Sequence, residues 1–237
     1  MDVNLRNHFP PLDPNSESRE STSSSEPSRV DEVYEGILLR IIRGELLGGT
    51  ELKSTRLARE MGLSRTPVVQ ALQRLASDGV VQLEMNKRAV VRSGAENWLV
   101  EIHQLRELLE PQAAATAADR MEPDQLDVLR QAAKAAKPRR GREDWTDAAW
   151  RFDSALHLAV ADASGNLALA AAIRKCWSFK RLSYLAAPET TQTLTKGYQE
   201  HMAILDALAT GDGPTASAAM LFHLRSAAKL RPSQRVV

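Results

Sequence analysis

The chain is short of cysteine, of long apolar runs and of net charge. Cys176 is the single cysteine among 237 residues, so an internal disulfide is impossible and a reducing compartment is indicated. No run of about 18 apolar residues could cross a membrane, and the polar N-terminus lacks the apolar centre of a signal peptide. We therefore expect a cytoplasmic protein with no membrane partner. Because the net charge is only +1, a nucleic-acid-binding surface would need a local excess of cations.

One stretch, from Arg56 to Leu75, is typical of two short helices joined by a tight turn. Gly62 suits the positive φ that ends a helix, and Ser64 is a good N-cap for the next one. Apolar residues then recur at the helical spacing i, i+3, i+4, i+7, namely at Val68, Ala71, Leu72 and Leu75. The remaining face would point outward with Arg65, Thr66, Val69 and Gln73. An ordinary packed helix pair shows this spacing too, whereas in a helix-turn-helix the start of the second helix meets base edges.

The residues that follow favour the second interpretation. Val80–Leu83 and Ala89–Val91 are typical of two short strands around a tip that carries Lys87 and Arg88. Between residues 53 and 92 there are eight cations and three acids, a local asymmetry typical of nucleic-acid binders. We therefore predict a winged helix-turn-helix at residues 29–93 that binds double-stranded DNA. The candidate contacts are Ser64, Arg65, Thr66, Gln73, Lys87 and Arg88.

The rest of the chain has a different pattern. Residues 1–28 are rich in Ser and Pro and bury too little to offset their ordering entropy, so we predict a disordered tail. Ser93-Gly94-Ala95 is expected to be a linker, and residues 97–231 read as an all-α bundle of about six helices. The fold class is thus mainly α. The expected helices are 98–120, 123–136, 145–163, 167–185, 190–209 and 214–230.

Three histidines of the bundle lie mid-helix among apolar neighbours: His157, His201 and His223. Asp153 precedes His157 by four residues, which places both side chains on one face of a helix. The other two histidines lie on the last two helices, which a short turn makes antiparallel neighbours. Each could be a hydrogen-bonded core residue. Together the four could also hold a divalent ion such as zinc, nickel or manganese.

Two sets of residues resemble known domains. Ser64-Arg65-Thr66-Pro67-Val68 followed by Ala71-Leu72 resembles the most characteristic run of the GntR family of bacterial transcription regulators. The bundle resembles the FadR-type effector domain, known as FCD. The matching positions there are Arg106, Glu110, Asp153 to His157, Ala163 to Asn166, Glu200-His201 and Phe222-His223.

This resemblance implies a homodimer that binds a palindromic operator and responds to a small organic acid. It implies that Asp153, His157, His201 and His223 hold the metal. Arg106 and Asn166 would then contact the carboxylate effector, although Arg106 could instead pair with Glu110 within its helix. We expect a repressor and no enzymatic activity. A metal-dependent hydrolase or isomerase is the alternative, because an Asp/His site with open positions can activate water.

The chain departs from the family pattern at two places that bear on DNA contact. Val69-Gln70 stands where the family usually has Arg-Glu, and the wing tip has Lys87-Arg88 without the usual glycine. These departures bear on the sequence and affinity of the operator and not on the DNA-binding role itself.

Overall fold

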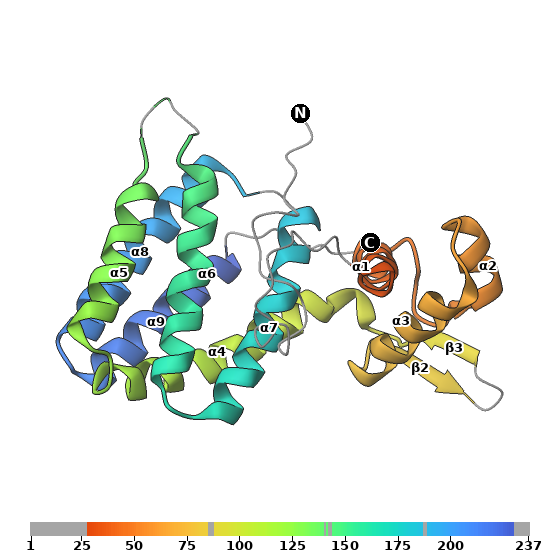
Figure 1. Ribbon diagram of the computed structural model, residues 1–237, viewed down its shortest axis with the longest axis horizontal. Helices are drawn as coiled ribbons and strands as arrows, with labels where there is room; N and C mark the ends of the chain where they lie inside the picture. Colours follow the sequence, from red (N-terminus) through yellow and green to blue (C-terminus); the bar gives the residue numbers. More distant parts are fainter. Residues whose placement is uncertain (1–27, 85–87, 140, 142–143, 187–188, 230–237) are drawn as a thin grey trace. The chain divides into compact units, whose positions relative to one another are not determined.

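The computed structural model describes residues 28–84, 88–139, 141, 144–186 and 189–229 (Figure 1). The chain divides into two compact units, with the division between Glu101 and Ile102. The division falls inside a helix, shortly after the predicted linker Ser93-Gly94-Ala95. Ala95 of this linker belongs to a 3-10 turn, η3 (Ala95–Asn97). Residues 1–27 of the predicted tail lie outside the described residues, and Ser28 is the N-cap of the first helix. No helix in the described ranges is both long and apolar enough to span a membrane.

The N-terminal unit is a winged helix, as predicted. Its helices are α1 (Arg29–Ile42), α2 (Ser54–Glu60) and α3 (Arg65–Ser77). Its strands are β1 (Glu51–Leu52), β2 (Val81–Glu84) and β3 (Arg88–Val91), which form an antiparallel sheet in the order β1-β3-β2. The sequence did not predict β1, because two residues show no alternation.

The turn between α2 and α3 follows the predicted chemistry. Gly62 has a φ of +65°, which ends the first helix at little conformational cost. Ser64 has extended backbone angles at the N-cap, but its side chain makes no capping hydrogen bond. The four residues of the apolar stripe of α3 are at most 5% exposed, namely Val68, Ala71, Leu72 and Leu75. The outward face is exposed as expected.

Polar side-chain contacts join α1 to α3. Arg74 donates to Asp31 Oδ1 at 2.7 Å, and its guanidinium lies 4.4 Å from the centre of the Tyr34 ring. Tyr34 in turn donates to Asp78 Oδ2 at 2.6 Å. Arg74, one of the eight cations counted in the sequence, therefore joins α3 to α1 through a half-buried ion pair.

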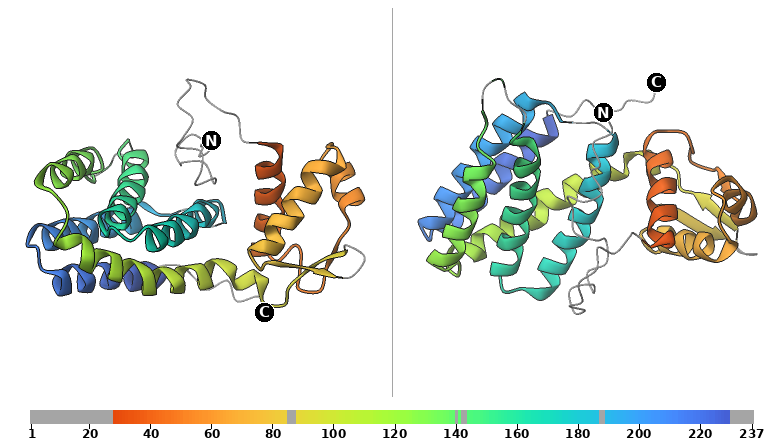
Figure 2. Two further views of the ribbon diagram at one scale, coloured as in Figure 1. Left: turned by 60° about the horizontal axis from the view of Figure 1, so that its bottom comes forward. Right: turned by 45° about the horizontal axis from the view of Figure 1, so that its top comes forward.

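The second unit is the predicted bundle of six helices (Figures 1 and 2). They are α4 (Trp98–Ala118), α5 (Pro123–Ala135), α6 (Thr146–Ala163), α7 (Leu167–Ala186), α8 (Thr191–Ala209) and α9 (Gly213–Lys229). Helix α6 packs against α5, α7 and α8, and α8 packs against α9. The core contains large side chains that are at most 1% exposed, among them Trp145, Phe152, Leu156 and Ile204. This packing brings the middle of α6 toward the middles of α8 and α9.

Candidate metal centre

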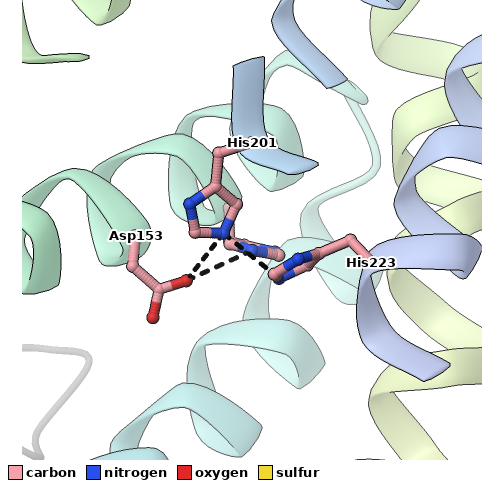
Figure 3. A group of neighbouring side chains, drawn as sticks. Asp153, His201 and His223 are labelled. Carbon is pink, nitrogen blue, oxygen red and sulfur yellow. Dashed lines mark hydrogen bonds and ion pairs between the residues drawn. The ribbon is translucent and has the colours of Figure 1, made fainter. Parts of the chain in front are cut away.

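Four side chains from three helices meet inside the bundle. Asp153 and His157 come from α6, His201 from α8 and His223 from α9. One ligand atom from each lies within 4.8 Å of all the others. Figure 3 shows Asp153, His201 and His223 pointing toward one another. The convergence expected from sequence spacing is therefore present.

The nitrogens at the centre lie close to one carboxylate oxygen. His201 Nε2 is 3.1 Å from Asp153 Oδ1 and 3.1 Å from His223 Nε2. His157 Nε2 lies 3.5 Å from the same oxygen. It is buried and has no hydrogen-bond partner among the described residues. A buried imidazole nitrogen without a partner is costly, and a metal ion at this place would satisfy it.

Two glutamates orient the outer nitrogens of the histidines. The Nδ1 of His157 donates to Glu110 Oε2, and that of His223 lies 3.0 Å from Glu200 Oε2. With the proton on Nδ1, each ring presents the lone pair of Nε2 to the centre. Carboxylates behind ligating histidines fix the tautomer and raise the basicity of the ligand in this way. Sequence reasoning did not assign this function to either glutamate.

Glu110 is itself held by three groups. Arg106 Nε donates to its Oε1 at 2.5 Å, and Trp177 Nε1 donates to the same oxygen at 3.0 Å. Burial alone would raise the pKa of Glu110. The charges and hydrogen bonds of Arg106 and His157 outweigh burial and lower this pKa to about 2. Glu110 is therefore a carboxylate at neutral pH and a good acceptor for His157.

Arg106 is thus paired with Glu110 within its helix, which was the alternative expectation from the sequence. Its side chain is 3% exposed, contacts Glu110 and lies 4.3 Å from the centre of the Trp177 ring. Arg106 is absent from the residues that line the cavity beside the centre. In this structure it positions His157 through Glu110, and a direct contact with an effector stays a prediction.

Asn166 also has a local structural function. Its Oδ1 accepts a hydrogen bond from Leu169 N at 3.1 Å at the start of α7, and the residue is exposed. It is likewise not among the lining residues. Its predicted contact with the effector therefore has no support in this geometry.

Asp153 uses its two oxygens differently. Oδ1 faces the histidines, whereas Oδ2 accepts a hydrogen bond from Lys180 Nζ at 2.5 Å. Burial would raise the pKa of Asp153, but the charge of Lys180 and the contact with His201 lower it well below its usual value. Lys180 was not predicted from the sequence, because nothing in the spacing of α7 relates it to Asp153.

A cavity opens beside this centre. Water-sized molecules can occupy about 40 Å³ of it, and its lining includes Phe152, Asp153, Lys180, Tyr198, His201 and His223. A small ligand in this cavity would touch Asp153, His201 and His223 directly.

The buried histidines predict a loss of stability in acid. Burial is the largest cause that lowers the pKa of His157, and burial with the neighbouring histidines holds that of His223 well below 6.5. The unfolded chain therefore binds more protons than the folded chain below about pH 6.5. The metal-free protein should keep its full stability above that pH and lose it as the pH falls. Melting temperatures between pH 5 and 8 in EDTA test this. A His223→Asn variant should show a flatter profile, and equal melting temperatures of the wild type at pH 5.5 and 7.5 would contradict the expectation.

Comparison with known proteins gives the family. Residues 101–226 match the FCD domain, and residues 29–91 match the bacterial regulatory proteins of the gntR family. The chain belongs to the GntR family of bacterial transcription regulators. GntR regulators bind DNA operators and FCD domains bind small-molecule effectors, so the hydrolase or isomerase alternative is set aside.

Individual relatives support this placement. The chain is 27% identical over 198 residues to the probable D-xylose utilization operon transcriptional repressor of Paenarthrobacter nicotinovorans, covering 81% of this chain and 84% of that protein. It is 28% identical to the transcriptional regulator LutR of Bacillus subtilis, covering 78% and 92%. Among solved structures, McbR/YncC of E. coli shares the fold with a TM-score of 0.57 at 23% identity, covering 85% and 95%.

Most of the predicted DNA contacts of this GntR chain are exposed, and their contact with DNA stays a prediction. Ser64, Arg65, Thr66 and Gln73 are exposed at or near the start and along one face of α3. The Arg88 side chain is 62% exposed, with its Nε 3.8 Å from Glu51 Oε1. Lys87 lies outside the described residues. Val69, at the position where the family usually carries arginine, is 37% exposed.

Proposed function

We propose that this protein is a cytoplasmic repressor that binds a palindromic operator as a homodimer and responds to a small organic acid. The acid would bind beside a divalent metal ion held by Asp153, His157, His201 and His223. The domains would be residues 29–93 for DNA and 97–231 for the effector. The observation that carries the proposal is the buried Asp/His cluster within a domain of the effector-binding class.

The residues fit a divalent ion. Three imidazole nitrogens and one carboxylate oxygen form a donor set that suits zinc, nickel or manganese. His157 and His223 are held in the ligating tautomer by Glu110 and Glu200, as is usual for metal-binding histidines. A bound ion would supply positive charge and coordination positions for carboxylate oxygens. The chain's own residues orient the ligands and surround the cavity.

The DNA-binding part of the proposal makes a prediction about Arg65. Its guanidinium lies at the exposed start of α3, where arginine can read guanine or contact a phosphate. Arg65→Ala should weaken operator binding by about 5- to 150-fold, equivalent to about 1–3 kcal/mol. Fluorescence anisotropy with an operator selected from random DNA measures the effect.

Lys134→Ala is the matched control, because it removes one exposed cation from the other unit. It should bind the operator like the wild type, and wild-type affinity should fall steeply with salt. If Arg65→Ala and Lys134→Ala bind equally well, α3 is not the helix that reads DNA.

A further inference from the structure

The cavity beside the metal centre has one strong positive group. Among the described residues that line it, Lys180 alone is a lysine or arginine. Its side chain is 9% exposed, its Nζ holds Asp153 Oδ2 at 2.5 Å, and it lies 4.7 Å from the centre of the Trp177 ring. A buried lysine at this place is costly unless its charge serves a partner.

The charges around the centre favour an anion only when a metal ion is bound. Four carboxylates lie in or near the cavity. Its lining includes Asp153, Glu189 and Glu200, and Glu110 contacts His157. Three cations accompany them, namely Lys180, Arg106 and Lys196. The set carries one net negative charge, and a divalent ion changes it to one net positive charge. The charge of such an ion would therefore be needed to attract an acid.

The geometry distinguishes Lys180 from Arg106. Asp153 joins the metal side of the cavity to Lys180, because Oδ1 faces the histidines and Oδ2 faces the ammonium. A carboxylate that reaches the metal is therefore also near the Lys180 charge. Arg106 donates to Glu110, and its guanidinium lies over the Trp177 ring, which Lys180 also contacts. Lys180 can reach a ligand in the cavity, whereas Arg106 is committed to Glu110.

We propose that Lys180, and not Arg106, is the cation that binds the carboxylate of a small acid effector. This inference rests on the proposed function. The cavity of about 40 Å³ has space for about three to four water-sized groups, at about 10–15 Å³ for each, and this favours a small acid. The ligand carboxylate bridges the metal side of the cavity and the ammonium of Lys180.

The test measures charge selectivity by calorimetry. Propionate and L-lactate are titrated into the metal-loaded protein beside their neutral amides, propionamide and lactamide. The wild type should bind the acids and not the amides. Lys180→Met and Lys180→Gln should bind the acids about 10- to 100-fold more weakly, the range of a lost charge-assisted hydrogen bond. They should also lose the preference for acid over amide, which a merely structural function of Lys180 would not change.

Lys175→Met is the matched control, since it removes an exposed lysine from the same helix, and it should bind the acids like the wild type. Undiminished acid binding by the metal-loaded Lys180 variants would overturn the assignment and leave the proposed function standing. If the wild type binds no acid, the effector site itself is wrong. Should the variants hold no metal, a crystal structure of the wild type with propionate decides. A carboxylate oxygen within hydrogen-bond distance of Lys180 Nζ supports the assignment, and its absence overturns it.

Discussion

Replacement of Arg106 by methionine is expected to lower the free energy of unfolding by about 3–5 kcal/mol. Arg106 and Glu110 are 3% and 1% exposed, and removing one partner of a buried ion pair leaves the other charge uncompensated. Metal affinity should fall as well, because Glu110 fixes the ring of His157. Urea denaturation followed by circular dichroism measures the change.

A double variant separates the lost charge from lost packing. Arg106→Met combined with Glu110→Gln removes both charges. The amide oxygen can still accept from Trp177, and the amide nitrogen can donate to His157 Nδ1 in the other tautomer of that ring. We expect this protein to recover most of the stability that the single variant loses. A single variant that is destabilised by less than about 1 kcal/mol, the range of an exposed pair, would show that this buried pair does not support the site.

Metal binding is expected to have the second large effect. Protein purified without chelator should contain about one divalent ion per chain, since one ligand set is present. An ion at 1,000 times its dissociation constant stabilises the native state by about 4 kcal/mol. EDTA should then lower the melting temperature by roughly 8–16 °C, at about 2–4 °C per kcal/mol for a protein of this size.

Two histidine variants test the ligand set. His201→Ala removes a nitrogen at the centre and should abolish both the bound metal and the response to EDTA. His103→Ala removes a histidine of the same unit whose Nε2 lies 2.8 Å from the Leu224 carbonyl oxygen, and it should keep the metal. Elemental analysis of both proteins gives the answer. Equal metal content in the two variants would exclude His201 as a ligand.

The fold was predictable where local patterns determine it. The six helices of the bundle and the apolar stripe of α3 follow from helical spacing and from turn residues such as Gly62. The strand β1 was missed because it has two residues and exists through its pairing with β3. The ion pair of Arg74 with Asp31 could not be predicted, because the two residues are 43 positions apart in the sequence.

The candidate site was predictable only in its ligands. Asp153 and His157 share a helix face, and the α8–α9 turn brings His201 and His223 together. The surrounding contacts depend on packing between distant segments. Glu110 and His157 are 47 positions apart, and Lys180 and Asp153 are 27 apart. The resemblance placed Arg106 near the site, and the helical spacing allowed its pair with Glu110. Neither could show that Lys180 lines the cavity.

The central claim is that an acid bound at the metal centre changes operator affinity. The direct measurement is fluorescence anisotropy of operator DNA titrated with metal-loaded protein, with and without the acid that binds best in the calorimetric series. The account predicts a change in operator affinity of about 5- to 150-fold, the usual span of such coupling. The acid's own affinity should change by the same factor when operator is bound, and EDTA should abolish both effects. An acid that binds the metal-loaded protein tightly while operator affinity stays unchanged would contradict the claim.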